Sequence, residues 1–376
     1  MDIKKVFFAI FSVLIYVSVY AVKIPAHSVI LYIGTFTNEG EGGLYKCTFD
    51  TVTGAIENIG LAQSMNNPNY LVISNDKRFL YACVRPQGDS AGSAVEAYKV
   101  NRATGSLAFI NKKLTTGNDP CYIDITPDGK IIAVANYGGG NLTIFHTNED
   151  GSLTDVVQSI EHKGSGPVKE RQQKAHAHSV RFSPFNNQVF AADLGIDKLM
   201  CYQLDQTEGK LLEGSQPFVG LAPGAGPRHF DFHPGGKIIY VVNELNSTVS
   251  VLERKGGTYK VVQVVKTIPG DYPGKNYCAD IHISSNGGSL YCSNRGHNSI
   301  TTFSIAKDGL LSFVGTTPAH GDWPRNFTLW PSGGFMLVAN QKSGNITVYR
   351  IDKETGIPVF INVNVKVPSP VCLVFL

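Results

Sequence analysis

The chain has few charged residues and no run of basic ones. Lys, Arg, Asp and Glu account for 17% of its 376 residues, and the net charge is only +3. No segment interleaves basic with aromatic side chains, as a nucleic-acid-binding surface would. We therefore expect no nucleic-acid partner. The 43% of hydrophobic residues is typical of a globular protein with a substantial core.

Cysteine is also scarce. The seven cysteines are an odd number, and none of them forms a C-x-x-C pair. Most lie inside stretches that resemble β-strands. A disulfide framework is therefore not expected, and we predict buried free thiols.

One long hydrophobic run stands near the N-terminus. VFFAIFSVLIYVSVY follows MDIKK, and small residues at Val19 and Ala21 match the pattern that a signal peptidase reads. We predict that residues 1–21 are a secretory signal, and that the protein is exported to the periplasm or outside the cell without stable membrane association after cleavage. An uncleaved anchor is the alternative, although the run is shorter than the ~20 residues that span a bilayer. Without a working signal the protein would be cytoplasmic.

Helical periodicity is absent after residue 21, and a hairpin pattern recurs in its place. The stretch GPRHFDFHPGGKIIYVVNEL (226–245) has the residues of two short strands joined by a tight HPGG turn. Strands like its first one begin at seven places, spaced 46 to 57 residues apart: 68, 120, 177, 227, 278, 324 and 370. A further alternating strand also occurs seven times, and each copy is closed by a glycine: Gly54, Gly105, Gly151, Gly209, Gly257, Gly309 and Gly356. A short apolar stretch follows most of these glycines, so each unit supplies four strands.

Seven units of four antiparallel strands predict an all-β fold, a seven-bladed β-propeller over residues 22–376. The seventh unit has only its first strand, VCLVFL, whereas the chain begins after the predicted signal with a second strand, VILYIGTF. We therefore expect strands from both ends of the chain to complete one blade. That arrangement closes the ring and removes an exposed sheet edge.

The repeat places two positions of every blade at one mouth of the central channel. The first strand of a blade lines the channel and the second runs back antiparallel to it, so the start of one meets the end of the other. The first-strand starts are assigned to Asn69, Cys121, His178, Arg228, Ala279, Arg325 and Val371. The second-strand ends are assigned to Thr35, Arg85, Asn136, Asp193, Glu244, Arg295 and Gln341.

Four arginines, one histidine and two carboxylates would thus converge, which predicts a pocket for an anionic ligand with a general base inside it. Arg228, Glu244 and Arg295 break the repeat, and such departures are expected where function overrides it. Arg325 and Arg85 are further candidates for binding the ligand.

Other polar residues of the repeat have structural explanations. Asparagines follow the second strand in four blades, at Asn136, Asn243, Asn294 and Asn340. We expect them to satisfy turn backbone. Asp193 replaces asparagine in this series, so it either does the same or binds substrate. His229 and His233 are expected to cap or pack.

The longest insertion, IEHKGSGPVKERQQKAHAH (160–178), lies between two units. Long loops in compact arrays tend to carry function. His176 and His178 alternate as the chain enters a channel-lining strand, where both could face the substrate. Two histidines at this spacing could also bind a metal, but no third ligand is near, so we expect neither metal nor cofactor.

Several motifs resemble those of a known family: YIGTFT (32–37), ANYGGGNLTIF (135–145), SNRGHNSI (293–300) and GDWPRNF (321–327), together with the repeat. The chain resembles the seven-bladed lactonase family, which includes propeller-type 6-phosphogluconolactonases and fungal carboxymuconate lactonising enzymes. The resemblance covers residues 30 to about 355. It implies that His178, Arg228, Glu244 and Arg295 form the active site.

The expected reaction is hydrolysis of a sugar-acid lactone. Glu244 or His178 would take the proton of the attacking water. Arg228 would support the oxyanion, and Arg295 with Arg325 would hold the phosphate or carboxylate of the substrate. His176, Arg85 and Asp193 complete the predicted substrate contacts.

Three alternatives remain open at this point. A cycloisomerase would close a muconate into a lactone at the same rim. A non-catalytic propeller would bind a protein there and show exposed aromatic residues. A calcium-dependent lactonase would need several carboxylates around the channel, and only Asp193 and Glu244 are available.

Overall fold

The computed structural model describes residues 27–36, 42–86 and 92–376. These residues form twenty-eight β-strands in seven four-stranded antiparallel sheets. Within the same ranges, no segment forms a helix with the length and apolar character that a membrane crossing requires. The predicted signal, residues 1–21, lies outside the described residues.

Each sheet is one blade, and its four strands run from the inside of the ring outward. Six blades use consecutive strands: β4 (Pro68–Ile73), β5 (Phe79–Val84), β6 (Ala94–Val100), β7 (Leu107–Leu114); β8 (Pro120–Ile125), β9 (Ile131–Asn136), β10 (Asn141–Thr147), β11 (Leu153–Glu161); β12 (Ala177–Phe182), β13 (Gln188–Asp193), β14 (Lys198–Asp205), β15 (Lys210–Gly220); β16 (Pro227–Phe232), β17 (Ile238–Asn243), β18 (Thr248–Lys255), β19 (Thr258–Lys266); β20 (Tyr277–Ile283), β21 (Ser289–Arg295), β22 (Ser299–Ile305), β23 (Leu311–Pro318); β24 (Pro324–Leu329), β25 (Phe335–Asn340), β26 (Asn345–Ile351), β27 (Pro358–Lys366). The seventh blade has the order β28 (Pro370–Phe375), β1 (Ser28–Thr35), β2 (Leu44–Asp50), β3 (Ile56–Gln63).

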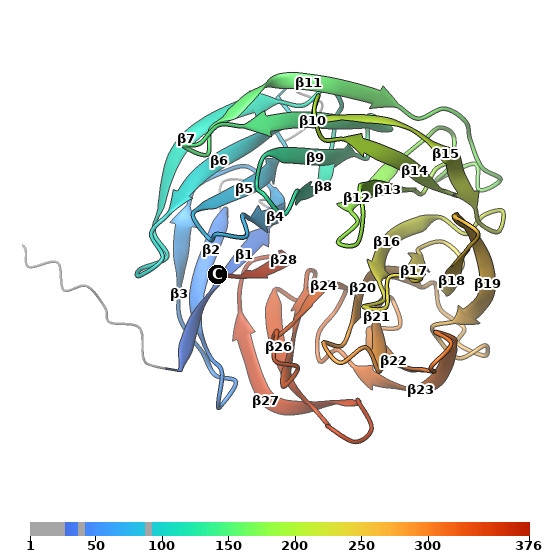
Figure 1. Ribbon diagram of the computed structural model, residues 1–376. Helices are drawn as coiled ribbons and strands as arrows, with labels where there is room; N and C mark the ends of the chain where they lie inside the picture. Colours follow the sequence, from blue (N-terminus) through green and yellow to red (C-terminus); the bar gives the residue numbers. More distant parts are fainter. Residues whose placement is uncertain (1–26, 37–41, 87–91) are drawn as a thin grey trace, which may run out of the picture.

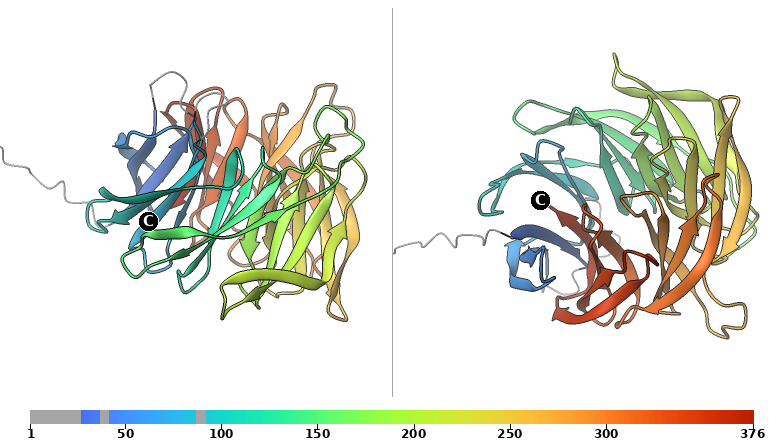
Figure 2. Two further views of the ribbon diagram at one scale, coloured as in Figure 1. Left: turned by 90° about the horizontal axis from the view of Figure 1, so that it is seen from above. Right: turned by 60° about the horizontal axis from the view of Figure 1, so that its bottom comes forward.

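The seven blades form a closed ring around a central channel (Figure 1). The innermost strands contact their neighbours all the way round, including β24 with β28 and β28 with β4. Two further views show the sheets side by side about the same axis (Figure 2). The predicted seven-bladed β-propeller is confirmed.

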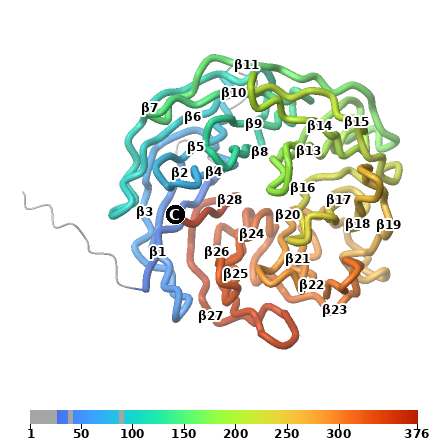
Figure 3. The backbone as a smooth tube through the Cα atoms, in the orientation of Figure 1, coloured from blue at the N-terminus to red at the C-terminus, as the bar shows by residue number. Residues whose placement is uncertain are grey.

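The ring closes through one pairing between the two ends of the chain. β28 pairs antiparallel with β1, with Leu31 opposite Phe375 and Ile33 opposite Leu373. Figure 3 shows the red C-terminal strand beside the blue first strand. The predicted closure by strands from both ends is therefore confirmed, and β1 has no free inner edge.

Burial follows the position of a strand in its blade. All six residues of β5 and of β9 are buried, because second strands pack against the sheets on both sides. An outer strand such as β7 exposes much of its length. The seven cysteines are all buried and free, as predicted.

The recurring glycines mark the places where neighbouring blades lock together. Gly151 has φ +83°, and a Cβ there would lie 2.2 Å from a ring carbon of Phe79. Its carbonyl accepts a hydrogen bond from the Tyr81 hydroxyl of the adjacent blade at 3.1 Å. Tyr32 and Gly105 repeat this contact at 3.1 Å one blade earlier. Only glycine fits both the backbone conformation and the space.

Candidate active site

Bulges in the inner strands turn the mouth-lining residues into the channel. In β16, Pro227 pairs with Asn243 and His229 with Val242, so that Arg228 has no partner opposite it. His178 and Arg325 are bypassed in the same way in β12 and β24. A bulge re-aims a side chain and is common near active sites. This local irregularity therefore carries three of the predicted site residues.

Glu244 lies at the centre of the cluster and is 3% exposed. Its Oε2 forms ion pairs with Nε of Arg228 at 3.1 Å and with Nη2 of Arg295 at 2.7 Å. Its Oε1 accepts Nη2 of Arg171 at 2.6 Å. The structure thus brings Arg228, Glu244 and Arg295 together, as predicted, and adds Arg171.

The charge state of Glu244 follows from these contacts. Burial alone would favour the neutral acid, but the three guanidiniums, Arg295 foremost, lower the pKa of Glu244 to about 2. Its Oε1 accepts a hydrogen bond from Arg171, and its Oε2 is paired with the charges of Arg228 and Arg295. Glu244 is therefore a permanent anion and a poor proton acceptor at neutral pH.

Backbone carbonyls and aromatic rings hold the two deeper arginines. Nη1 of Arg228 donates to the carbonyl of Ala279 at 2.6 Å. Arg295 donates from Nε to the carbonyl of Tyr277 at 3.2 Å and packs 5.4 Å from the centre of the Trp323 ring. Burial, and then repulsion from Arg295, lowers the pKa of Arg228 to about 10, which leaves it charged at neutral pH.

Arg325 has no counterion among the described residues. Its guanidinium lies 5.0 Å from the centre of the Phe36 ring, and within the same residues it makes no hydrogen bond or ion pair. Burial and the charges of Arg228 and Arg295 place its pKa well below the usual value for arginine. A partly buried cation without a described counterion is suited to an anionic ligand.

His178 supplies a neutral base beside these cations. It is 5% exposed, and burial followed by the charge of Arg228 holds its pKa well below the usual value. Its Nδ1 lies 3.8 Å from Sγ of Cys121. Burial raises the pKa of the Cys121 thiol to about 12, and the thiol donates to the carbonyl of His178 at 3.3 Å. The pair is therefore uncharged.

The insertion is tied down by buried polar contacts. Nδ1 of His162 lies 2.6 Å from Oδ2 of Asp193, and the Tyr202 hydroxyl lies 2.8 Å from the other ring nitrogen. Oδ1 of Asp193 accepts the backbone N–H of His176 at 2.7 Å. Both oxygens of Asp193 are therefore used within its own blade and the loop. The insertion anchored in this way carries Arg171, which forms an ion pair with Glu244.

His176 lies at the outer edge of the cluster. Its ring stacks on Tyr137 with centroids 4.5 Å apart, and its Nδ1 donates to the Tyr137 carbonyl at 2.9 Å. Tyr137 also faces His178, with ring centroids 5.3 Å apart, and its hydroxyl lies 3.4 Å from Nη2 of Arg171. The two aromatic rings form one wall of the mouth.

The assignment of second-strand ends mixed two positions and was wrong in register. Asn136 and Asp193 pair with the first residue of their inner strands, as Asn243 does. Glu244 lies one residue further along, so its counterpart in the β8–β11 blade is Tyr137 rather than Asn136. Correct alignment of the repeating asparagines would have identified Tyr137 from the sequence.

Two residues differ from the prediction: Arg85 lies apart from the cluster, and Arg171 belongs to it. Arg85 is half-exposed and pairs with Asp119 at 2.7 Å, without contact to Glu244. Arg171 was missed, because it stands in an insertion where no repeat exists to be broken. The signal that could have found it was the loop itself, which already held two predicted site histidines.

Among the described residues, no three His, Cys, Asp or Glu side chains converge as a metal site would require.

Comparison with known proteins identifies the class. Residues 30–375 match the family described as Lactonase, 7-bladed beta-propeller. The chain belongs to this family of lactonases, as its motifs predict.

Its relatives include named lactonases. The chain is 39% identical to the 6-phosphogluconolactonase of Bacillus subtilis over 349 residues, which are 92% of this chain and 97% of the relative. It is 37% identical to that of Formosa agariphila over 332 residues, covering 87% and 93% of the two chains. The structure of the periplasmic gluconolactonase of Pseudomonas aeruginosa is similar with a TM-score of 0.88 and 32% identity, over 93% of this chain and 99% of that one.

The ion cluster predicts a difference in acid stability between the wild type and Glu244→Gln. A carboxylate whose pKa is depressed in the fold stabilises it fully above the pKa of the unfolded chain, near 4.5, and loses this contribution as the pH falls toward about 2. The advantage of the wild type over Glu244→Gln should therefore shrink by up to about 3 kcal/mol across that window. Urea-unfolding midpoints measured from neutral pH downward check this.

Glu170→Gln is the matched control, because Glu170 is exposed on the same loop as Arg171. It should change stability by less than about 0.5 kcal/mol at every pH. A wild-type advantage over Glu244→Gln that stays constant with pH would contradict the assigned charge state.

Proposed function

We propose that the protein hydrolyses an anionic sugar-acid lactone, such as 6-phospho-D-glucono-1,5-lactone, to the open acid. One observation carries this proposal: four guanidiniums surround a single carboxylate. Those of Arg171, Arg228 and Arg295 share Glu244, and Arg325 has no counterion among the described residues. An anionic ligand would supply the missing negative charge. The family and the named relatives support ester hydrolysis of a lactone as the reaction.

Arg325 is proposed to hold the phosphate or carboxylate of the substrate. A planar guanidinium can donate two parallel hydrogen bonds to such a group. Arg295 contributes charge, but its Nε already donates to Tyr277, and its Nη2 donates to Cys278 and forms an ion pair with Glu244. Arg325 is therefore the stronger candidate for direct contact.

His178 is proposed to be the general base. The attacking water would transfer a proton to its imidazole while the water oxygen bonds to the lactone carbonyl carbon. The same proton can then pass to the ring oxygen as the ester bond breaks. Glu244 is less suited, because three arginines hold it ionised with a pKa of about 2.

Arg228 is proposed to stabilise the oxyanion. Its Nη1 donates to Ala279 and its Nε forms an ion pair with Glu244, whereas Nη2 has no hydrogen-bond partner among the described residues. An N–H group at that position would meet the negative charge that develops on the carbonyl oxygen, and a well-placed donor is worth about 3 kcal/mol.

Three remaining candidates receive outer roles. His176, on the Tyr137 wall, and Arg85, at the rim, are proposed to contact the distal part of the substrate. Asp193 is proposed to act indirectly, by anchoring the loop that carries Arg171.

An unphosphorylated aldonolactone is the second candidate substrate. The structural similarity to a periplasmic gluconolactonase favours it, as does the predicted signal at residues 1–21. An exported enzyme would not meet a cytosolic sugar phosphate, so the location of the protein bears on the substrate. The lactone chemistry is the same in both cases.

Arg325→Ala should separate the two substrates. We expect KM for 6-phosphogluconolactone to rise by about tenfold or more, because a charge-assisted contact of about 1.5–3 kcal/mol is lost. KM for glucono-1,5-lactone should change by less than about threefold, since it lacks the phosphate. Initial rates corrected for spontaneous ring opening measure both.

Arg78→Ala is the control for loss of an arginine, since Arg78 pairs with Asp76 in a turn of the β4–β5 hairpin. Equal effects of Arg325→Ala on both substrates would remove the phosphate from the proposed role of Arg325.

The pH profile should report His178. A base with a lowered pKa is still deprotonated below pH 6.5, so kcat/KM for glucono-1,5-lactone should hold its neutral value below that pH and fall only in more acidic buffer. His178→Gln should reduce kcat/KM by about 10²–10⁴ and abolish this acidic limb. A limb that persists unchanged in His178→Gln would assign the base elsewhere.

Export can be checked directly on the protein made in cells. If residues 1–21 are cleaved as a signal, N-terminal sequencing of the secreted or periplasmic fraction should begin at Val22. Recovery of the intact N-terminus from the cytoplasm would contradict the proposal.

A further inference from the structure

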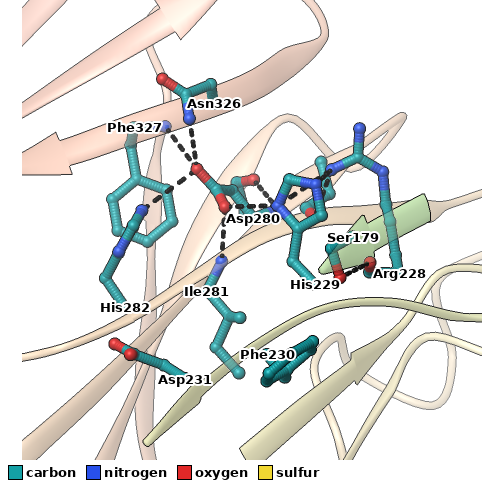
Figure 4. Close-up of polar contacts among 12 residues, drawn as sticks. Ser179, Arg228, His229, Phe230, Asp231, Asp280, Ile281, His282, Asn326 and Phe327 are labelled. Carbon is teal, nitrogen blue, oxygen red and sulfur yellow. Dashed lines mark hydrogen bonds and ion pairs between the residues drawn. The ribbon is translucent and has the colours of Figure 1, made fainter. Parts of the chain in front are cut away.

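A second polar layer lies directly beneath the mouth. His229 follows Arg228 in β16, and the bulge allows both side chains to reach the channel (Figure 4). His229 is 4% exposed, and its Nδ1 lies 2.7 Å from Oδ1 of Asp280 in β20. Nη1 of Arg228 lies 3.2 Å from Nε2 of the same ring. Arg228, His229 and Asp280 thus form a continuous chain from the mouth into the core.

The partners of Asp280 fix the tautomer of His229. The carboxylate accepts the backbone N–H groups of Ile281 at 3.1 Å and Phe327 at 3.2 Å, and the side-chain amide of Asn326 at 2.5 Å. Burial opposes its ionisation, but the neighbouring histidines and these donors keep the pKa of Asp280 well below the usual value. Asp280 can therefore only accept, so Nδ1 of His229 carries the proton.

The other ring nitrogen of His229 is then an acceptor. Burial and the charge of Arg228 lower the pKa of His229 to about 3, so the ring stays neutral with a lone pair on Nε2. Nη1 of Arg228 lies 3.2 Å from Nε2 and 3.5 Å from Nδ1. Because it is nearly equidistant from the two nitrogens, it lies against the ring rather than on the lone-pair axis of Nε2, and the ring supports Arg228 by contact.

These contacts hold Arg228 on three sides. Nη1 donates to the carbonyl of Ala279 and lies against the His229 ring, and Nε faces Glu244. Nη2 is left without a partner among the described residues. The plane of the guanidinium is therefore set by groups behind it, while its free edge stays available to a ligand.

We propose that His229 is a positioning residue for the lactone reaction, and that it acts by fixing the free Nη2 edge of Arg228 toward the substrate carbonyl. Asp280 contributes by holding the His229 ring in place through Nδ1. This inference rests on the proposed function of the mouth. It replaces the expectation that His229 only caps or packs, although its ring also packs against Tyr122, with centroids 5.0 Å apart.

A double-mutant cycle tests whether His229 acts through Arg228. His229→Phe keeps an aromatic ring and removes both nitrogens. We expect it to lower kcat for glucono-1,5-lactone by about 10–100-fold with little change in KM, since a transition-state donor is misplaced. In an Arg228→Ala background the same change should have less than about a twofold effect, because the group it positions is gone.

Independent effects would overturn the proposal. If His229→Phe lowers kcat/KM by the same factor with and without Arg228, His229 does not act through Arg228. His229→Gln should restore most of the rate, because its amide can still donate to Asp280 and keep the side chain against Arg228. Failure of His229→Gln to exceed His229→Phe would also count against positioning.

His282→Phe is the matched control. His282 contacts Asp280 at 3.2 Å from the other side and packs against Phe327, but it touches no group of the mouth. Its replacement also removes a histidine partner of Asp280. We expect it to lower thermal stability while leaving kcat/KM within about twofold of wild type, as for a site that is energetically independent of the mouth. A rate loss equal to that of His229→Phe would show that general damage to the Asp280 network explains both.

A spectroscopic measurement separates this inference from the proposed function. Nitrogen-15 NMR of the labelled wild type should show a protonated Nδ1 and an unprotonated Nε2 in His229 from about pH 5 to 9. A proton on Nε2 would overturn the inference even if the enzyme is active. A protein that hydrolyses no lactone would overturn the proposed function, while the observed tautomer would still show whether Asp280 holds the His229 ring through Nδ1.

Discussion

The carboxylate of Glu244 makes the mouth of the channel possible. It gathers guanidiniums from the insertion, from β16 and from β21, three segments far apart in the sequence. Two unit charges 4 Å apart interact by about 4 kcal/mol at the effective dielectric constant near a protein surface, so three unshielded arginines would repel one another strongly. One shared anion offsets that repulsion and leaves the site with an excess of positive charge. Glu244 is thereby a counterion, and its low pKa makes it a poor proton acceptor at neutral pH.

The bulged inner strands explain how the site is layered. A regular strand would turn Arg228 and His229 to opposite faces. The bulge lets the first residue reach the mouth and the second reach the layer beneath it, where Tyr70 and Tyr122 stack with ring centroids 4.0 Å apart. Groups that could touch a ligand therefore lie directly on groups that hold them still. Such support restricts the movement of a long side chain without using its free donors.

Much of the fold could be predicted from the sequence, because every blade obeys the same pattern. The seven glycine turns and the split seventh unit led to the ring and its closure. Arg228, Glu244 and Arg295 were found because they depart from positions that the other blades share, and the structure places them in contact. Arg171 could not be predicted from the repeat, because it lies in an insertion that the other blades do not share.

The predicted positions of Asn136 and Asp193 were wrong by one residue. The asparagine that repeats at the end of the second strand was aligned with the charged residue that follows it in other blades. His229 has a channel-facing role in the structure that strand alternation does not anticipate, since a bulge has no clear signature in a single sequence. The packing of neighbouring blades decides where such irregularities are tolerated.

The pairing of β28 with β1 has a consequence for how the protein reaches its native state. Six blades are each built from strands contiguous in the chain, so their contacts are local and can form early. The seventh joins segments separated by most of the polypeptide, and closing so long a loop carries the larger entropic cost. β28 also lies between β24, which carries Arg325, and β4, and it contacts both strands. Assembly of the arginine cluster is therefore coupled to closure of the ring, and a chain trapped before that closure would present both an unpaired strand edge and an incomplete cluster.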